Sequence, residues 1–145
     1  MKVKSRKFLS PFLILISLLA GTIFFIWYTE KPYVVRKYEV NLSEAVFRIP
    51  AEREIVYKVK FRNKMFVIRN YTFPNSSAMK GFAETIKKEG ENIEPIEIGN
   101  LTGIKFTLKE NSTLSAILVE MDKSLITILG EKNNIEEVMR WFLKI

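Results

Sequence analysis

The feature that most constrains this chain is an uncharged run from Phe8 to Thr29. It follows a basic start, residues 1–7, which holds four Lys and Arg side chains and no acidic one. About 20 apolar residues at ~1.5 Å rise cross the ~30 Å hydrocarbon core of a bilayer as a helix. Basic residues ahead of such a helix favour a cytoplasmic N-terminus. The pattern therefore predicts a single-pass cell-membrane protein. Residues 1–7 would be cytoplasmic, residues 8–29 a transmembrane signal anchor and residues 30–145 an extracellular domain.

A cleaved signal peptide is the alternative interpretation of this run. Its apolar region would be roughly 7–15 residues long and would end at small residues. The only small cluster is Ala20–Thr22, and Leu18 stands where a small side chain is needed. We therefore expect an uncleaved anchor, with the lipid bilayer as its partner through residues 8–29. Ser17 and Gly21 form one small-xxx-small pair, which lets membrane helices approach closely, so a weak homodimer through these two residues is a further expectation.

Without its first 29 residues the chain has the length of one domain and is only mildly basic. Its remaining 116 residues carry 19 basic and 16 acidic side chains, whereas the whole chain has a net charge of +7. This balance argues against a dedicated nucleic-acid binder. The chain has no Cys and no His. Disulfides, thiol nucleophiles, histidine bases and the usual transition-metal ligands are therefore excluded. The Glu-, Lys- and Ile-rich composition is typical of hyperthermophilic proteins and predicts an archaeal source.

Residues 30–145 have the pattern of one α+β domain without repeats. Alternating apolar and polar side chains predict strands, and amphipathic segments predict helices. The expected elements are strands at 33–40 and 55–61, a partner strand ended by Pro74, a helix from Ser76 or Ser77 to about Glu89, strands at 93–98, 103–109, 114–121 and 124–129, and a helix at 135–145. This order of strands, helix, four strands and helix predicts a mainly antiparallel sheet with two packed helices. The predicted fold class is therefore α+β, with the transmembrane helix in front of this domain.

The hairpin near residue 63 supplies the candidate binding surface. With Asn63-Lys64 as its two-residue turn, Phe61 would face Phe66, and Val59 would face Ile68. One face of the ribbon is then apolar, and the other carries a basic strip of Lys58, Lys60, Arg62 and Arg69. A strip of one charge sign suits an anionic ligand, either a glycan or nucleic acid. An ordinary solvated sheet face has the same pattern and is the alternative interpretation.

Two other patterns are candidates for chemistry. Ser77 and Lys80 match S-x-x-K at a helix start, but the companion K-T-G and S-D-N elements are absent, so we interpret the match as coincidental. Four glutamates crowd one loop and strand start, where a hard cation such as Ca²⁺ would find oxygen ligands. They are Glu89, Glu91, Glu94 and Glu97. No EF-hand spacing accompanies them, and a solvated acidic loop is the preferred interpretation. We therefore expect no catalytic residue, no metal and no cofactor.

Glycosylation sequons occur more often than chance predicts. The pattern N-x-[ST] is found at Asn41, Asn70, Asn75, Asn100 and Asn111. All five lie after the predicted anchor, on the side where glycosyltransferases act, so they are candidate glycosylation sites. The alternative is turn chemistry, because Asn, Ser and Thr all favour turns. Asn70 is the weakest candidate, since the favoured hairpin register puts it on the inner face.

The segment Gly103–Ile145 forms a meander, a polar turn and an amphipathic C-terminal helix. This order resembles small exported domains of the PsbP-like and lipoprotein-regulator type, and the resemblance implies an α+β fold; no function and no residues are carried over from it. The residues themselves predict a membrane-anchored surface protein without enzymatic activity, whose domain binds or scaffolds an envelope protein or glycan. The alternative is an anion-binding accessory domain that uses the basic hairpin face.

Overall fold

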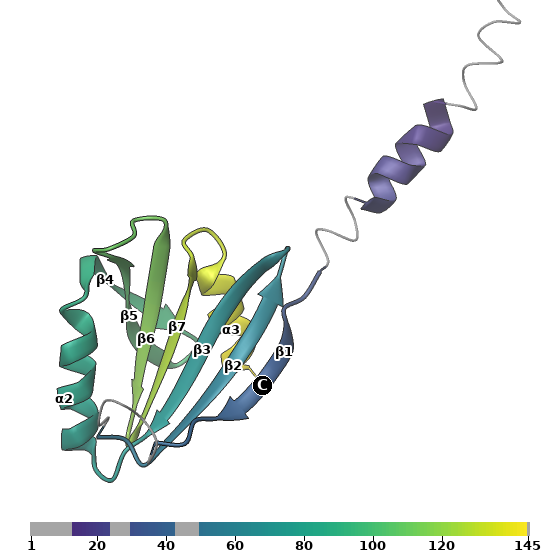
Figure 1. Cartoon of the computed structure of the whole chain (residues 1–145). Helices are drawn as coiled ribbons and strands as arrows, with labels where there is room; N and C mark the ends of the chain where they lie inside the picture. The colour runs from purple at the N-terminus through teal and green to yellow at the C-terminus, as the bar shows by residue number, and fades with distance from the viewer. Residues whose placement is uncertain (1–12, 24–29, 43–49, 145) are drawn as a thin grey trace, which may run out of the picture. The chain divides into compact units, whose positions relative to one another are not determined.

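The computed structural model describes residues 13–23, 30–42 and 50–144. The chain divides into two units, Met1–Lys31 and Pro32–Ile145. The second unit is a sheet-rich α+β domain (Figure 1). Its elements in chain order are β1 (Tyr33–Glu39), β2 (Arg53–Phe61), β3 (Lys64–Thr72), α2 (Ser76–Lys87), β4 (Gly90–Ile98), β5 (Leu101–Leu108), β6 (Leu114–Met121), β7 (Ser124–Glu131) and α3 (Ile135–Leu143).

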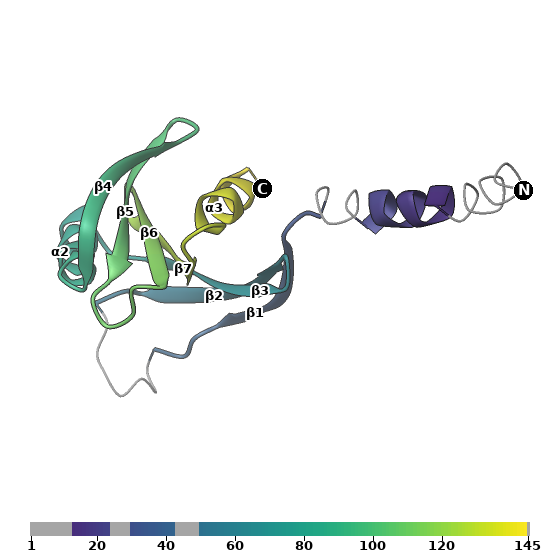
Figure 2. The same cartoon turned by 90° about the horizontal axis from the view of Figure 1, so that it is seen from above.

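The seven strands form one antiparallel sheet in the order β1-β2-β3-β7-β6-β5-β4. Two meanders, β1–β3 and β4–β7, are therefore joined where β3 pairs with β7. The sheet is strongly curved, with α3 inside the curve and α2 on the outer side (Figure 2). We call these two sides of the sheet the α3 face and the α2 face.

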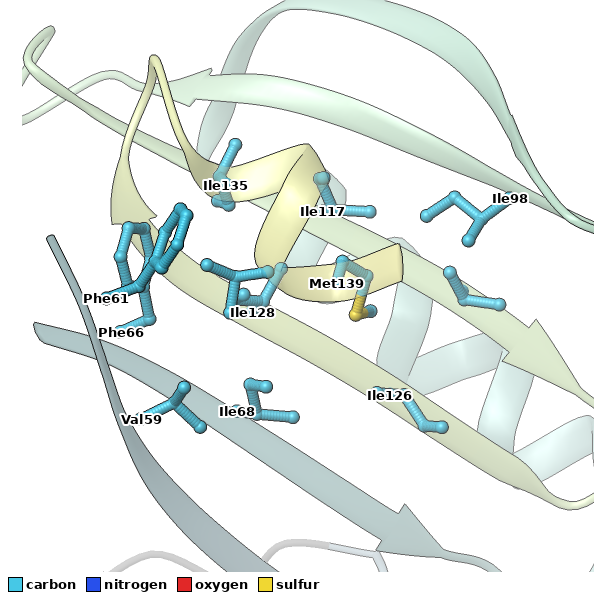
Figure 3. Packing of buried hydrophobic residues seen from close by; sticks show 12 residues of the cluster. Val59, Phe61, Phe66, Ile68, Ile98, Ile117, Ile126, Ile128, Ile135 and Met139 are labelled. Atoms are coloured by element: carbon cyan, nitrogen blue, oxygen red, sulfur yellow. The ribbon is translucent and has the colours of Figure 1, made fainter. Parts of the chain in front are cut away.

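Each helix covers its own hydrophobic core. The core on the α3 face is the larger one, and its centre is the contact of α3 with β2, β3, β6 and β7 (Figure 3). Its buried members are Val59, Phe61, Phe66, Ile68, Ile98, Ile117, Val119, Ile126, Ile128, Ile135, Val138 and Met139. The core on the α2 face contains Tyr71, Phe73, Met79, Ala83, Phe106, Ala116, Leu118 and Leu125. Because successive strand residues alternate between faces, β6 and β7 are apolar on both sides.

The hairpin between β2 and β3 turns one residue earlier than the sequence predicts. Its two turn residues are Arg62 and Asn63, and their φ angles of 49° and 61° are both positive, as a type I′ turn requires. Val59 therefore pairs with Phe66, rather than with Ile68. Each pairing is displaced by two residues, so every side chain stays on its predicted face while its partner changes.

The prediction of an N-terminal transmembrane helix is wrong, and with it this part of the predicted fold class and the localisation as a single-pass membrane protein. The α+β class of the domain, with its antiparallel sheet, is confirmed. Residues 13–23 are helical. At ~1.5 Å per residue the described residues 13–23 span about 16 Å, roughly half of the ~30 Å bilayer core. In the described parts of the chain, none of the helices combines the length and the apolar composition needed to cross a bilayer. The rest of the predicted anchor, residues 8–12 and 24–29, and the basic start at 1–7 lie outside the described residues.

Both ends of α2 differ from the prediction. The side-chain oxygen of Asn75 accepts the backbone N–H of Ala78 at 2.8 Å, so Asn75 caps this helix instead of Ser76 or Ser77. Gly90 does not simply follow the helix but is the first residue of β4. A Cβ at Gly90 would lie 2.3 Å from Cδ2 of Phe106. Glycine at this position therefore allows the Phe106 ring to pack under the start of β4.

Candidate functional site

Three cationic side chains lie next to one another on the α2 face, near the β1 edge of the sheet. Arg36 on β1 and Lys58 on β2 are register partners, and Lys60 lies two residues further along β2 on the same face. We call Arg36, Lys58 and Lys60 the basic cluster. Like charges directly opposite each other on neighbouring strands are destabilising. The cluster is therefore a place where the sheet carries an unfavourable charge arrangement.

The basic cluster differs from most other cations on the sheet and on α3 in its lack of acidic partners. Most of the other cations on the sheet and on α3 have a carboxylate nearby, as in the pairs Lys64–Glu131 (2.6 Å) and Lys105–Glu136 (3.0 Å). Among the residues that the structure describes, no ion pair joins Arg36, Lys58 or Lys60 to a carboxylate. Arg36 instead lies over the ring of Tyr38, with Cζ 4.8 Å from the ring centroid. Three positive charges are thus left for solvent or for a ligand.

The structure divides the basic strip predicted from the sequence. Lys58, Lys60 and Arg69 share the α2 face. Arg62 lies in the turn, where its guanidinium lies over the Phe61 ring and 3.8 Å from Glu137 of α3. Arg62 and Arg69 therefore both have acidic partners within the domain, and Arg36, which the sequence analysis did not include, takes their place.

Arg69 is neutralised by a buried carboxylate. Its Nη1 donates to Oε1 of Glu54 at 2.5 Å, and the Glu54 side chain is only 4% exposed. Burial lowers the pKa of Arg69, but the hydrogen bond to Glu54 and the charges of nearby Tyr71, Glu54 and Tyr38 together outweigh burial, so the pKa is raised and the guanidinium stays charged. Burial, together with the charge of Glu54, raises the pKa of Tyr71 to about 12. These three side chains form a closed polar group in the sheet.

Apolar side chains flank the basic cluster. Tyr33 on β1 and Met65 on β3 are the register partners of Lys60, and each is 49% exposed. On β7, Leu129 is 38% exposed. The exposed surface around the cations is therefore amphipathic.

A small cavity of about 210 Å³ lies on the same face, beside the end of α2. We call it the α2 pocket. Its apolar lining comes from four strands and the helix: Val67, Ile86, Phe106, Leu108, Ala116 and Leu129. Arg69, Tyr71, Thr127 and Glu89 contribute to its border. A mostly apolar hollow with a few polar groups at its rim is the usual character of a small-molecule site.

The other sequence patterns fall on the surface. Ser77 and Lys80 are both exposed on α2. Glu89, Glu91, Glu94 and Glu97 lie at the end of α2 and along β4, and they are exposed as well. Over the described ranges, no group of three acidic side chains is close enough to hold a metal ion. Ser17 and Gly21 lie in the helix at 13–23, and a Cβ at Gly21 would meet nothing within 4 Å.

The five sequons lie in different structural contexts. Asn41, Asn75, Asn100 and Asn111 are exposed, the last with its side-chain oxygen accepting from both the N–H and the hydroxyl of Thr113. Asn70 lies in the central strand β3 and faces α3, with its side-chain oxygen buried. The exposed asparagines are the accessible ones, and their glycosylation stays a prediction.

No protein-family model matches the sequence, no curated protein matches it, and no solved structure matches the fold. The resemblance of Gly103–Ile145 to PsbP-like and lipoprotein-regulator domains therefore rests on the order of elements alone.

Proposed function

We propose that this domain binds an anionic ligand through the basic cluster of Arg36, Lys58 and Lys60. This takes up the alternative expectation from the sequence, an anion-binding domain that uses the basic hairpin face, with Arg36 in place of Arg62 and Arg69. The observation that carries the proposal is the cross-strand pair of Arg36 and Lys58. Two cations held directly opposite each other without a described acidic partner repel one another, and a bound anion removes that repulsion.

The arrangement of the three side chains suits a small anionic group. Lys58 and Lys60 are half-buried, so their stems pack along the sheet while their ammonium groups reach solvent. Arg36 provides planar donors that match carboxylate or phosphate. The three groups lie on two neighbouring strands, whose spacing is about 4.8 Å. A single anionic group thus lies within reach of more than one cation.

Charge reversal of the cluster tests this proposal. The variant Arg36→Glu/Lys58→Glu/Lys60→Glu is compared with the wild type on a heparin column, with elution by a salt gradient. A matched control reverses three exposed lysines elsewhere, Lys80→Glu/Lys109→Glu/Lys132→Glu, and so has the same net charge. The affinity of the cluster for a polyanion should fall as the salt concentration rises. We expect the wild type and the control to be retained and the cluster variant to pass through at low salt.

Two results would contradict the proposal. If the wild type is not retained at low salt, the cluster does not bind polyanions. If the control variant loses retention as strongly as the cluster variant, the effect comes from net charge and not from this site. Melting temperatures of all three proteins establish that the variants are folded.

A further inference from the structure

The basic cluster and the α2 pocket belong to one continuous row of side chains. Successive register pairs connect Arg36 to Lys58, Lys58 to Val67, Val67 to Leu129, Leu129 to Ala116 and Ala116 to Phe106. Register partners on neighbouring strands lie on the same face. The row therefore runs across six strands of the α2 face, with two cations at one end and four apolar side chains at the other.

The apolar end of this row forms part of the α2 pocket. Val67, Leu129, Ala116 and Phe106 all line it, and Ile86 from the last turn of α2 completes the apolar wall. Phe106 and Ala116 are buried, whereas Leu129 is partly open to solvent. Within the row, the pocket is thus buried at Phe106 and Ala116 and open to solvent at Leu129, which is nearer to the basic cluster.

Distances along the row set the size of a ligand. Neighbouring strands are about 4.8 Å apart, so Lys58 is one strand spacing and Arg36 two spacings from Val67 at the pocket. The pocket volume of about 210 Å³ is below the ~300–1,000 Å³ of pockets that enclose a whole small molecule. The pocket has room for an apolar chain, while a charged head would stay outside, over β2 and β1.

We propose that the α2 pocket takes the hydrocarbon chain of a single-chain amphiphile whose anionic head group, a carboxylate or a phosphate, pairs with Lys58 and Arg36. This inference rests on the proposed function and names its ligand class. Burial of its methylene groups stabilises the complex, and the head group relieves the repulsion between the two cations. Arg69 lies at the pocket border but is already paired with Glu54, so the head group is directed to the basic cluster.

Four probes separate the two halves of the ligand. Calorimetric titration of the full chain uses decanoate, decyl phosphate, decanol and inorganic phosphate, each below its micelle concentration or solubility limit. We expect decanoate and decyl phosphate to bind at least tenfold more tightly than decanol and at least tenfold more tightly than inorganic phosphate. A preference between the two anionic amphiphiles distinguishes a carboxylate from a phosphate head group. Decanol that binds as tightly as decanoate would overturn the role of the cations.

Two tryptophan substitutions test the pocket without altering charge. Leu129→Trp fills the pocket from its open side, whereas Ile93→Trp adds the same ring to an exposed position of β4, away from the basic cluster and outside the pocket lining. We expect Leu129→Trp to lower the affinity for decanoate at least tenfold and to leave elution from heparin unchanged. Ile93→Trp should retain both decanoate binding and retention on heparin. An equal loss of decanoate affinity in the two variants would overturn the α2 pocket as the site of the hydrocarbon chain.

The outcomes keep this inference separate from the proposed function. Retention on heparin that depends on the basic cluster, with no decanoate binding by the wild type, would overturn the amphiphile and leave anion binding intact. No retention on heparin, with decanoate bound as tightly by the charge-reversed variant as by the wild type, would overturn both the anion site and the role of the head group. The comparison of decanoate with decanol uses the wild type alone and is independent of how any variant folds.

Discussion

Nη1 of Arg69 lies 2.5 Å from Oε1 of Glu54, and this contact joins side chains of very different exposure. The Glu54 side chain is 4% exposed and that of Arg69 is 42% exposed. The carboxylate has therefore lost nearly all of its water, whereas the guanidinium keeps part of its hydration. The two partners should respond very differently to removal, because an unpaired buried charge costs far more than an unpaired charge at the surface.

Arg69→Met should lower the free energy of unfolding by about 3 kcal/mol, because it leaves the Glu54 carboxylate buried without its partner. Glu54→Gln should cost only about 1 kcal/mol, because the amide still offers an oxygen to Arg69. Urea unfolding at pH 7 measures both. The free energy of unfolding of the double variant should fall by less than the sum of the two single losses, since both substitutions remove the same Arg69–Glu54 interaction. Equal losses for the two single variants would contradict the asymmetry.

Tyr71 should make stability fall at alkaline pH. Its pKa in the folded domain is about 12, above the value of about 10 for an unperturbed tyrosine. The phenol therefore contributes stability in full below pH 10 and loses it as the pH rises through about 12, by about 2–3 kcal/mol in total. Unfolding of the wild type and of Tyr71→Phe, compared at pH 8 and pH 12, should show a smaller pH dependence in the variant. Tyr33→Phe, at an exposed position, is the control and should follow the wild type.

The faces of the β2–β3 hairpin were predictable from sequence, but its register was not. Alternation assigns Val59 and Phe61 to the core whichever register is used, because a shift by two residues keeps the face. The turn itself carries no Asn-Gly or Asp-Gly signal. It puts Arg62 at positive φ, which is uncommon for a residue with a long side chain. The predicted turn, Asn63-Lys64, therefore matches turn propensities better than the observed turn, Arg62-Asn63.

Arg36 was missed because a bulge changes which side chains share a face. Unbroken alternation in β1 would put Arg36 on the same face as Val34 and away from Tyr33. The register shifts between Val34 and Arg36, and this shift brings Arg36 onto the face of Lys58 and Lys60. Pairing of β1 with β2 is also nonlocal, since residues 40–52 lie between the two strands in the sequence. Neither the bulge nor the α2 pocket, which five separate elements build, has a signature in a linear pattern.

The wrong prediction of a transmembrane helix came from the length of the uncharged run at residues 8–29. Composition gives the preference of side chains for lipid, but a membrane span also requires a continuous helix of about 20 residues. Among the described residues, no helix has that length together with the required apolar composition. The domain at 32–145 was better predicted, because its strands and helices are each set by local periodicity and by turn residues such as Gly99 and Asn111.

The docking of α3 should depend on Met139 more than on Phe142. Met139 is fully buried, whereas Phe142 is partly buried and packs edge-on against Tyr57 with ring centroids 4.9 Å apart. Met139→Ala should therefore cost about 3 kcal/mol, and Phe142→Ala about 2 kcal/mol, in the free energy of unfolding. Chemical denaturation with tryptophan fluorescence of Trp141 as the probe measures both. A loss below about 1 kcal/mol for Met139→Ala would mean that α3 is not docked as described.

Two glycines should respond in opposite directions to the same substitution. A Cβ at Gly130 would lie 2.2 Å from Cδ1 of Phe66, a ring that is completely buried, so Gly130→Ala forces the core on the α3 face to shift and should cost about 1–3 kcal/mol. Gly81 lies within α2, is exposed, and has nothing within 4 Å of its Cβ position. Gly81→Ala should stabilise the domain by about 0.5–1 kcal/mol, because alanine loses less backbone entropy in a helix. Thermal unfolding measures both variants. The double variant Gly130→Ala/Phe66→Leu should recover part of the loss, because it removes the ring that the new methyl group meets; a Gly130→Ala protein as stable as the wild type would contradict this close packing.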